Sequence, residues 1–360
     1  MIRIITICSN NYGNRLQNLA LTKVLERMTE DSVVTLRIRD RKPFQSMVNK
    51  HWELFHFAKN SLLGIVKERN KAAIPFLAFT HQHIPTIQLC PEDLIGLDGV
   101  FVIGSDQCWN PGWGLGARKD GIQCAVGIPP ERKIAYAASI GIQYRDMPAE
   151  WRGRYASWLS DVGSISMREE EGARAVRELI GRAVPTVLDP TMLLKAEEWQ
   201  RIEKKPAGEN RLEEDFCLKY VLGEGDESDQ IEQIAAKAGA KVFDMGRVSK
   251  PIGPAEFLWL IHHAKIICTD SFHGSVFSLL FHRPFVIFNR RDSYVDMSSR
   301  FETLGSFSQV NSHRYGEDGF SWDAVWNMDW RTFEIELAAK RNSSEAWLGE
   351  ALDKARKYDA

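Results

Sequence analysis

A histidine, His273, follows the point where a buried strand gives way to an apolar helix, within residues 265–280. In a parallel α/β sheet, such a junction presents backbone N–H groups and the positive end of the helix dipole to a ligand. We therefore predict an anion-binding site at this junction. The alternative is an ordinary N-capping serine with a histidine nearby. The residues of the predicted site are Asp270, Ser271, His273, Gly274 and Ser275.

Polar side chains also follow three other predicted strands, which end near residues 8, 103 and 167. Because the carboxyl ends of parallel strands lie along one edge of a sheet, we expect these side chains to share a crevice with His273. Amides and carboxylates bond sugar hydroxyls, an indole ring stacks on a sugar face, and arginine matches carboxylate or phosphate. Turn-forming asparagines, a buried tryptophan and a surface ion pair are the alternatives. The candidates are Asn10, Asn14, Gln17, Ser105, Asp106, Gln107, Trp109 and Arg168.

Strand-like apolar runs alternate with helical segments along most of the chain. This alternation implies right-handed crossovers and two doubly wound, Rossmann-like α/β domains that face a cleft. The expected strands are 3–8, 32–38, 99–103, 133–139, 164–167 and 184–188 in the first half, and 216–222, 241–243, 265–269 and 284–288 in the second.

The length of 360 residues suits two domains rather than one. The charged, turn-rich stretch 195–215 is typical of a linker between them. We expect a first domain at 1–194, a second at 216–328, and C-terminal helices at 329–360 that could pack back on the first domain.

The composition excludes several classes of protein. A formal net charge of -2 gives no reason to expect a nucleic acid partner. The six cysteines are scattered, as is typical of buried reduced thiols. The segment 9–17 lacks the GxGxxG and GK[ST] patterns, so we predict neither NAD nor ATP. With no signal peptide or apolar run of about 20 residues, we expect a cytoplasmic protein, leaving open peripheral contact with the inner face of the membrane.

Five stretches of the sequence, in order, resemble the polysaccharide pyruvyl transferase family, and together they span residues 4 to about 305. The resemblance implies a fold similar to the GT-B glycosyltransferases. It also implies transfer of the pyruvyl unit of phosphoenolpyruvate to a sugar of a surface polysaccharide precursor, as a cyclic ketal. The stretches are CSNNYGNRLQNLAL, IGSDQCWNP, ISMREEEG, VLDPTMLL and TDSFHGSVFSLLFHRPFV.

The resemblance places Arg168 and His273 at the phosphoenolpyruvate donor, with Arg300 as a weaker third cation. Ketal formation needs an acid to protonate the methylene carbon and a base for the attacking hydroxyl. His273 is our candidate acid, and Asp106 or Asp270 is the base. We expect no metal and no cofactor besides the donor substrate, and a sugar or lipid-linked oligosaccharide as acceptor. The rival hypotheses are a GT-B-like glycosyltransferase using a nucleotide sugar and a noncatalytic glycan-binding relative.

Overall fold

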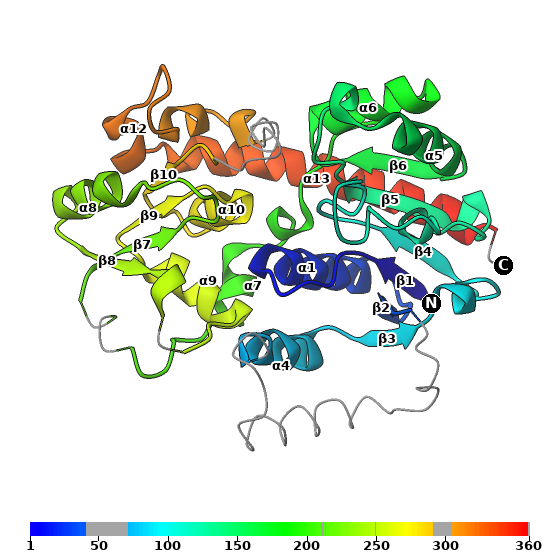
Figure 1. The fold of residues 1–360 in the computed structure, drawn as a ribbon, viewed down its shortest axis with the longest axis horizontal. Coiled ribbons are helices and arrows are strands. Elements are labelled where there is room, and N and C mark those ends of the chain that lie inside the picture. The colour runs from blue at the N-terminus through cyan, green and yellow to red at the C-terminus, as the bar shows by residue number, and fades with distance from the viewer. Residues whose placement is uncertain (41–70, 210–211, 213, 249, 291–303, 359–360) are drawn as a thin grey trace.

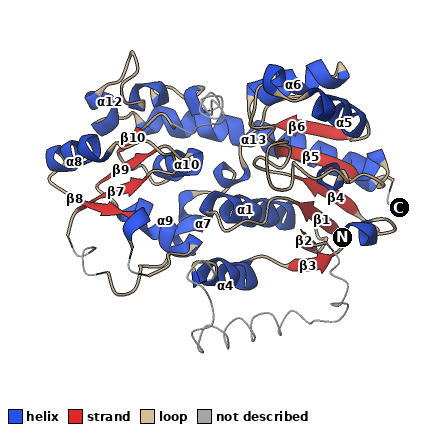
Figure 2. Ribbon diagram, viewed as in Figure 1, coloured by secondary structure: helices blue, strands red, loops and turns tan. Residues whose placement is uncertain are grey.

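In the described part of the chain, two sheets of parallel strands, one in each half of the molecule, form the frame (Figures 1 and 2). The computed structural model describes residues 1–40, 71–209, 212, 214–248, 250–290 and 304–358. Arg300, one of the candidate cations, lies outside the described residues.

The first sheet has six strands in the order β3-β2-β1-β4-β5-β6, all parallel. Its central strands carry apolar residues on both faces, as a sheet covered by helices on both sides requires. Its strands are β1 (Ile2–Ile5), β2 (Val33–Ile38), β3 (Thr86–Leu89), β4 (Val100–Ile103), β5 (Lys133–Ala138) and β6 (Ser164–Met167). The helices of this half include α1 (Tyr12–Met28), α4 (Ile74–His83), α5 (Ala149–Ser160) and α6 (Glu170–Ile180).

The second sheet has four parallel strands in the order β10-β9-β7-β8. Helix α7 (Ala196–Gln200) lies on the chain between the two sheets. The strands are β7 (Phe216–Tyr220), β8 (Lys241–Asp244), β9 (Ile266–Thr269) and β10 (Phe285–Ile287), and the helices are α8 (Ser228–Lys237), α9 (Pro254–His263), α10 (Phe272–Leu280) and α12 (Trp322–Trp326).

This architecture confirms the predicted fold class of two Rossmann-like, parallel α/β units. Three details differ from expectation. Strand β3 was not predicted, because it is a short edge strand with only one buried residue. The strand expected at 184–188 makes a single bridge, between Met167 and Thr186. The expected C-terminal helices are one continuous helix, α13 (Trp330–Arg356). The sheets occupy residues 2–167 and 216–287, and the domain boundaries stay a prediction.

Helix α13 joins the two halves (Figure 1). Near its start, Glu334 lies 2.8 Å from His282 of the second half. Further along, Arg341 donates to the carbonyl of Leu194 at 3.0 Å, and the hydroxyl of Ser344 accepts from the amide of Leu188 at 3.0 Å. The remainder packs against β4 and β5 of the first sheet. No helix among the described residues has both the length and the apolar character needed to cross a membrane.

Each sheet reverses its winding direction between two neighbouring strands. In the first sheet these strands are β1 and β4, and in the second they are β7 and β9. At such a switch point the connections leave in opposite directions and open a crevice at the carboxyl ends of the strands. The loops and helix starts after these four strands are therefore where a ligand site is expected.

Tyr12, the first residue of α1, anchors one half on the other. Its ring stacks on Phe257 of α9 with centroids 4.6 Å apart and planes within 4°. Phe76 and Tyr220 pack around it, and its hydroxyl donates to the carbonyl of Ile252 at 3.2 Å. One cluster of buried apolar side chains runs through both halves. Since large apolar contacts suppress relative domain motion, we infer that the two halves keep a fixed relative orientation.

We predict that Tyr12→Ala lowers the free energy of unfolding by about 2–3 kcal/mol, because it removes a stacked aromatic side chain from this contact. Tyr12→Phe, which loses only the hydrogen bond, should cost about 1 kcal/mol. Denaturant unfolding measures both. Calorimetry should show one transition in wild type and two in Tyr12→Ala. Equal stability of the alanine variant and wild type would contradict this role.

Candidate active site

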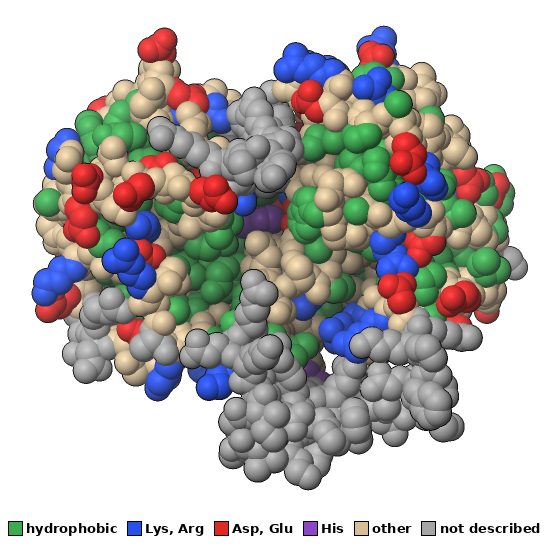
Figure 3. Space-filling view, viewed as in Figure 1, with side chains coloured by type: hydrophobic (Ala, Val, Ile, Leu, Met, Phe, Trp, Pro, Cys, Tyr) green, Lys and Arg blue, Asp and Glu red, His purple; other side chains and the backbone are tan. Residues whose placement is uncertain are grey.

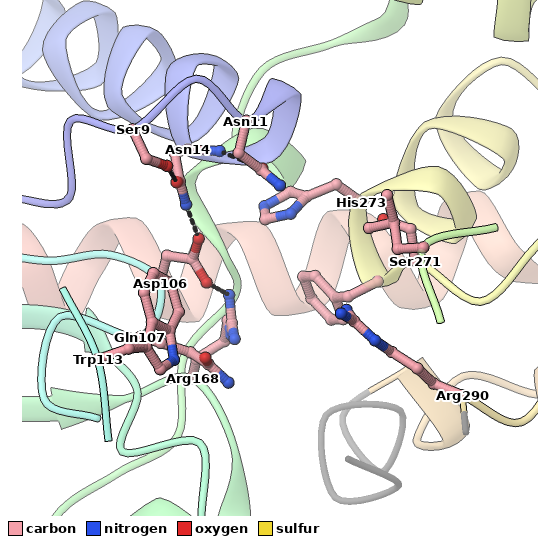
Figure 4. A pocket seen from close by; sticks show the side chains of 12 residues that line it. Ser9, Asn11, Asn14, Asp106, Gln107, Trp113, Arg168, Ser271, His273 and Arg290 are labelled. Atoms are coloured by element: carbon pink, nitrogen blue, oxygen red, sulfur yellow. Dashed lines mark hydrogen bonds and ion pairs between the residues drawn. The ribbon is translucent and has the colours of Figure 1, made fainter. Parts of the chain in front are cut away.

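A cavity of about 380 Å³ lies where the two switch points meet. Figure 3 shows a histidine at the bottom of a hollow between the halves, and Figure 4 shows the side chains that line the cavity. The first half contributes residues that follow β1, β4 and β6, and the second half contributes residues that follow β7, β9 and β10. The lining residues are Ser9, Asn11, Asn14, Asp106, Gln107, Trp113, Arg168, Leu222, Ser271, Phe272, His273 and Arg290.

Arg168 is a buried cation surrounded by carboxylates, with only 1% of its surface exposed. Its Nη1 donates to Asp106 Oδ1 at 3.1 Å and to Asp189 Oδ2 at 3.4 Å, and its Nε donates to Glu169 Oε2 at 3.2 Å. Its guanidinium carbon also lies 4.6 Å from the centre of the Phe272 ring. Three carboxylates thus share one guanidinium at the edge of the cavity.

Asp189 connects this cluster to the histidine. Its Oδ1 accepts from the amide and the hydroxyl of Thr191, at 3.0 and 2.7 Å, and its Oδ2 accepts from the hydroxyl of Ser105 at 3.1 Å. The same Oδ2 lies 3.7 Å from Nε2 of His273. A single buried carboxylate therefore faces a cation of the first half and the histidine of the second.

The electrostatics of the cluster follow from these contacts. Burial alone would raise the pKa of Asp189, but His273, Arg168 and the amide of Thr191 together hold it well below its usual range. Burial alone would lower the pKa of Arg168, and the charges of Asp106, Glu169 and Asp189 outweigh it, so that pKa is raised. Both groups are therefore ionised at neutral pH.

Asp106 is held at the mouth of the first switch point. Its φ of 65° lies in the left-handed region, which aspartate tolerates better than most residues. While Oδ1 binds Arg168, Oδ2 accepts from the side-chain amide of Asn14 in the first turn of α1, and the carbonyl of Asn14's side chain accepts from Ser9 (Figure 4). Asn11 caps the same helix by accepting from the amide of Asn14 at 3.2 Å.

His273 reaches from α10 toward the start of α1 (Figure 4). Ser271 caps α10 by accepting from the amide of Gly274 at 3.3 Å, which sets the histidine in the first turn. Among the described residues, no partner lies within hydrogen-bond distance of His273 Nε2. On the other side of the ring, a side chain at Gly13 would overlap Nδ1. Glycine at position 13 therefore allows α1 to approach the imidazole.

A model of the family described as polysaccharide pyruvyl transferase matches residues 11–293, which include every residue that lines the cavity except Ser9. The chain belongs to the polysaccharide pyruvyl transferase family. No curated protein matches it.

Several solved structures resemble the chain at low identity. A UDP-GlcNAc 2-epimerase from Neisseria meningitidis, bound to UDP-GlcNAc, is 10% identical with a TM-score of 0.48, covering 98% of this chain and 99% of its own. The glycosyltransferase UGT71G1 of Medicago truncatula, complexed with UDP-glucose, is 11% identical with a TM-score of 0.40, covering 98% of each chain. At these values we draw no conclusion about activity from either structure.

Several residues that we expected in the pyruvyl transferase site are buried in the fold and have structural roles instead. Trp109 is fully buried, and its Nε1 donates to the carbonyl of Gln123 at 2.9 Å, so it cannot stack on a sugar. Trp113, four residues later and 42% exposed, lines the cavity in its place. Gln17 and Ser105 are buried and bonded to each other at 3.0 Å, behind the cavity wall.

The candidates around His273 also divide into two groups. Ser271 lines the cavity, whereas a side chain at Gly274 would overlap Thr269, and Ser275 donates to the carbonyl of Ser271 at 3.3 Å. The carboxylate of Asp270 accepts from the amides of Leu222 and Gly223, both at 2.7 Å, and does not line the cavity. Burial raises the pKa of Asp270, and these two amides oppose that shift. Asn10 is exposed outside the cavity, and its neighbour Asn11 lies in it.

Sequence reasoning missed several lining residues and the central carboxylate. Asp189 was visible as the aspartate of VLDPTMLL, but its distance from residue 273 along the chain gave no sign of their proximity. Arg290 follows β10 and lines the cavity. Its position after a predicted strand was the sequence signal that could have identified it. Ser9, Asn11 and Phe272 flank residues that were predicted.

One further grouping could bind a metal ion, apart from the cavity. Glu203, His262 and His263 each offer a ligand atom within 4.8 Å of the others, near the end of α9. His262 Nδ1 lies 2.9 Å from Glu203, and His263 Nδ1 lies 2.9 Å from the carbonyl of Trp259. These contacts account for the grouping without an ion.

We predict that Asp189→Asn lowers the free energy of unfolding by about 2–3 kcal/mol at neutral pH. The loss is moderate for a buried ion pair because Asp106 and Glu169 still face Arg168. The folded-state pKa of Asp189 lies below its unfolded value near 4, so its contribution is present above that value and is lost as pH falls through the folded-state pKa. The difference in the free energy of unfolding between the variant and wild type should therefore become smaller below about pH 4. Asp146→Asn, which removes an exposed carboxylate, should show no difference at any pH.

We predict that Gly13→Ala displaces the His273 ring, because the new methyl group would occupy its place, at a cost of about 1–3 kcal/mol. The NMR signals of the imidazole ring should shift, and thermal unfolding should occur earlier. Gly153→Ala is the matched control, since nothing lies within 4 Å of a side chain at this position in α5. It should gain up to about 1 kcal/mol from helix propensity. An unmoved His273 signal in Gly13→Ala would contradict the close approach.

Proposed function

We propose that this protein transfers the pyruvyl group of phosphoenolpyruvate to a sugar of a cell-surface polysaccharide precursor and forms a pyruvate ketal. The observation that supports this most is the cavity itself, where the first turn of α10 with His273 faces the carboxylates bound to Arg168, in a member of the pyruvyl transferase family.

The donor would bind mainly through the second half. Phosphoenolpyruvate carries a phosphate and a carboxylate, so its site needs several donors. The first-turn amides of Phe272 and His273 have no intrahelical acceptor and point out of the helix start. Arg290 lines the same side of the cavity. The helix-start amides can bind one anionic group of the donor, and Arg290 can bind the other. The imidazole of His273 lies between these donors and the first half.

Arg168 then has a different role from the one that the resemblance implied. Its Nε and Nη1 already donate to three carboxylates, so its direct hold on the donor would be limited. It fixes Asp106 through the ion pair of 3.1 Å between Nη1 and Oδ1. We propose that Arg168 acts on the reaction chiefly by orienting Asp106.

The chemistry would proceed in two additions at one carbon. His273 protonates the methylene carbon of the donor, while a sugar hydroxyl adds to the neighbouring carbon and gives its proton to Asp106. The bond from that carbon to the phosphate oxygen then breaks, and inorganic phosphate leaves with the proton that Asp106 had taken. A second hydroxyl of the same sugar adds to the same carbon and passes its proton to His273, which closes the ketal ring and restores both side chains. Asp106 is preferred to Asp270 as the base because only Asp106 lines the cavity.

The acceptor would lie on the side of the first half. The indole of Trp113 is 42% exposed and can stack on a sugar face. Beside it, Gln107 is 1% exposed, and its Nε2 has no hydrogen-bond partner among the described residues. An unpaired buried amide is costly, and a sugar hydroxyl would satisfy it.

Incubation of the purified protein with phosphoenolpyruvate and candidate glycolipids tests the proposal. We expect phosphate release that depends on both substrates, with a mass gain of the glycolipid corresponding to a pyruvate ketal. His273→Gln should lower the rate by about 10²–10⁴-fold, the usual contribution of a general acid. His263→Gln, which changes an exposed histidine outside the cavity, is the control and should keep the wild-type rate. Release of phosphate without any gain in acceptor mass would refute transfer.

A further inference from the structure

Arg15, in the first turns of α1, is buried and has no counter-charge in the described part of the chain. It is 1% exposed, as is Arg168. Its Nη2 donates to the carbonyl of Cys8 at 3.4 Å, a long hydrogen bond. In the described part of the chain, neither its Nε nor its Nη1 has a hydrogen-bond partner. Buried arginines are normally paired, as Arg168 is with three carboxylates. The guanidinium of Arg15 lacks such partners among the described residues.

Among the residues that the structure describes, the surroundings of Arg15 add positive charge and no negative charge. Arg37, near the end of β2, is the charged residue whose field acts on it. Burial, assisted by Arg37, lowers the pKa of Arg15. The thiol of Cys8 does not compensate, because burial raises its pKa despite both arginines. Two cations thus lie together at the carboxyl ends of β1 and β2.

Close neighbours of Arg15 and Cys8 along the chain line the cavity. Cys8 precedes Ser9, which lines the cavity, and Asn14, the neighbour of Arg15 in α1, bonds the candidate base Asp106. Cys8 and Arg37 are half-buried, so the guanidinium can be approached from their side. A substrate whose sugar contacts Trp113 and Gln107 could extend along the sheet edge to these cations.

We propose that Arg15 and Arg37 bind a phosphate or diphosphate group through which the acceptor sugar is attached to its carrier. This inference rests on the proposed function for the identity of the acceptor. Two neighbouring cations that no described carboxylate pairs match a phosphate, whose oxygens accept bidentate bonds from arginine. The donor site proposed at α10 and Arg290 would hold the donor's own anionic groups, so we assign the ligand of Arg15 to the second substrate.

Inorganic pyrophosphate is the probe for the first test, by calorimetry and thermal unfolding of the full-length protein. Arg15→Met should weaken pyrophosphate binding by about tenfold to a hundredfold, the range for charged hydrogen bonds. The unliganded variant should unfold at a higher temperature than wild type, because it no longer buries an unpaired charge. Arg27→Met, on the exposed side of the same helix, is the control and should leave binding unchanged.

The outcomes separate a binding role from a structural one. Arg15→Met with unchanged pyrophosphate affinity, or with a lower unfolding temperature, overturns the proposal. If this variant does not fold, Arg37→Gln replaces it, since its side chain is only half-buried. That variant should bind pyrophosphate several-fold more weakly, and wild-type affinity would overturn the proposal. Displacement of pyrophosphate by phosphoenolpyruvate would overturn the assignment to the acceptor.

Transfer assays distinguish the carrier and keep the two proposals apart. Arg15→Met should lose activity on polyprenyl-diphosphate and nucleoside-diphosphate sugars and retain it on the same sugar without phosphate. Loss of activity on the polyprenyl-diphosphate sugar alone would identify the lipid as the natural carrier. Loss of activity on the nucleoside-diphosphate sugar alone would identify the nucleotide as the carrier. Equal loss on the phosphate-free sugar would overturn the proposal. If no acceptor is pyruvylated by wild type, the proposed function fails, while the pyrophosphate result still decides whether Arg15 is an anion site.

Discussion

The contact of Asp189 with Arg168 and His273 links the two halves of this molecule at the cavity. Asp189 belongs to the first half, and its carboxylate lies 3.4 Å from Arg168 and 3.7 Å from His273 of the second half. A buried carboxylate is stable only when hydrogen bonds and opposite charge surround it, and Thr191 and Ser105 supply the hydrogen bonds. The stability of the ionised Asp189 and the position of the histidine are therefore linked. A shift of α10 that moved His273 away would remove one of the groups that surround this buried carboxylate.

The aromatic contact of Tyr12 and the glycine that follows it also hold the two halves together. Tyr12 holds the start of α1 on α9, and Gly13 lets the next turn approach the imidazole. Asn14 then bonds Asp106. Three consecutive residues thus set the spacing between the halves, the position of the histidine and the orientation of a carboxylate. Because these contacts position the groups that line the cavity, they lower the cost of ordering a ligand there.

Much of the frame could be predicted, because βα alternation and buried apolar runs are local signals. The helix start at Ser271 and the polar ends of β1, β4 and β6 were local in the same sense. Trp109 and Trp113 could not be distinguished, since which ring enters the core depends on the path of a loop rather than on residue type. Asp189 and Arg290 could not be assigned to the site, because their proximity to His273 depends on packing between the halves. The unpaired state of Arg15 was also invisible, since pairing is a property of three-dimensional neighbours.

The two buried arginines of the first half show why burial alone does not identify a ligand-binding cation. Arg168 is surrounded by carboxylates, so an incoming anion would compete with three fixed negative charges. Arg15 has only a long bond to a carbonyl and a second cation beside it. Leaving a charge unpaired in the interior is unfavourable for stability, and proteins retain such features where a function requires them. The cation that the fold has not neutralised is therefore the better candidate for an anionic substrate, even though the sequence pattern directed attention to the other.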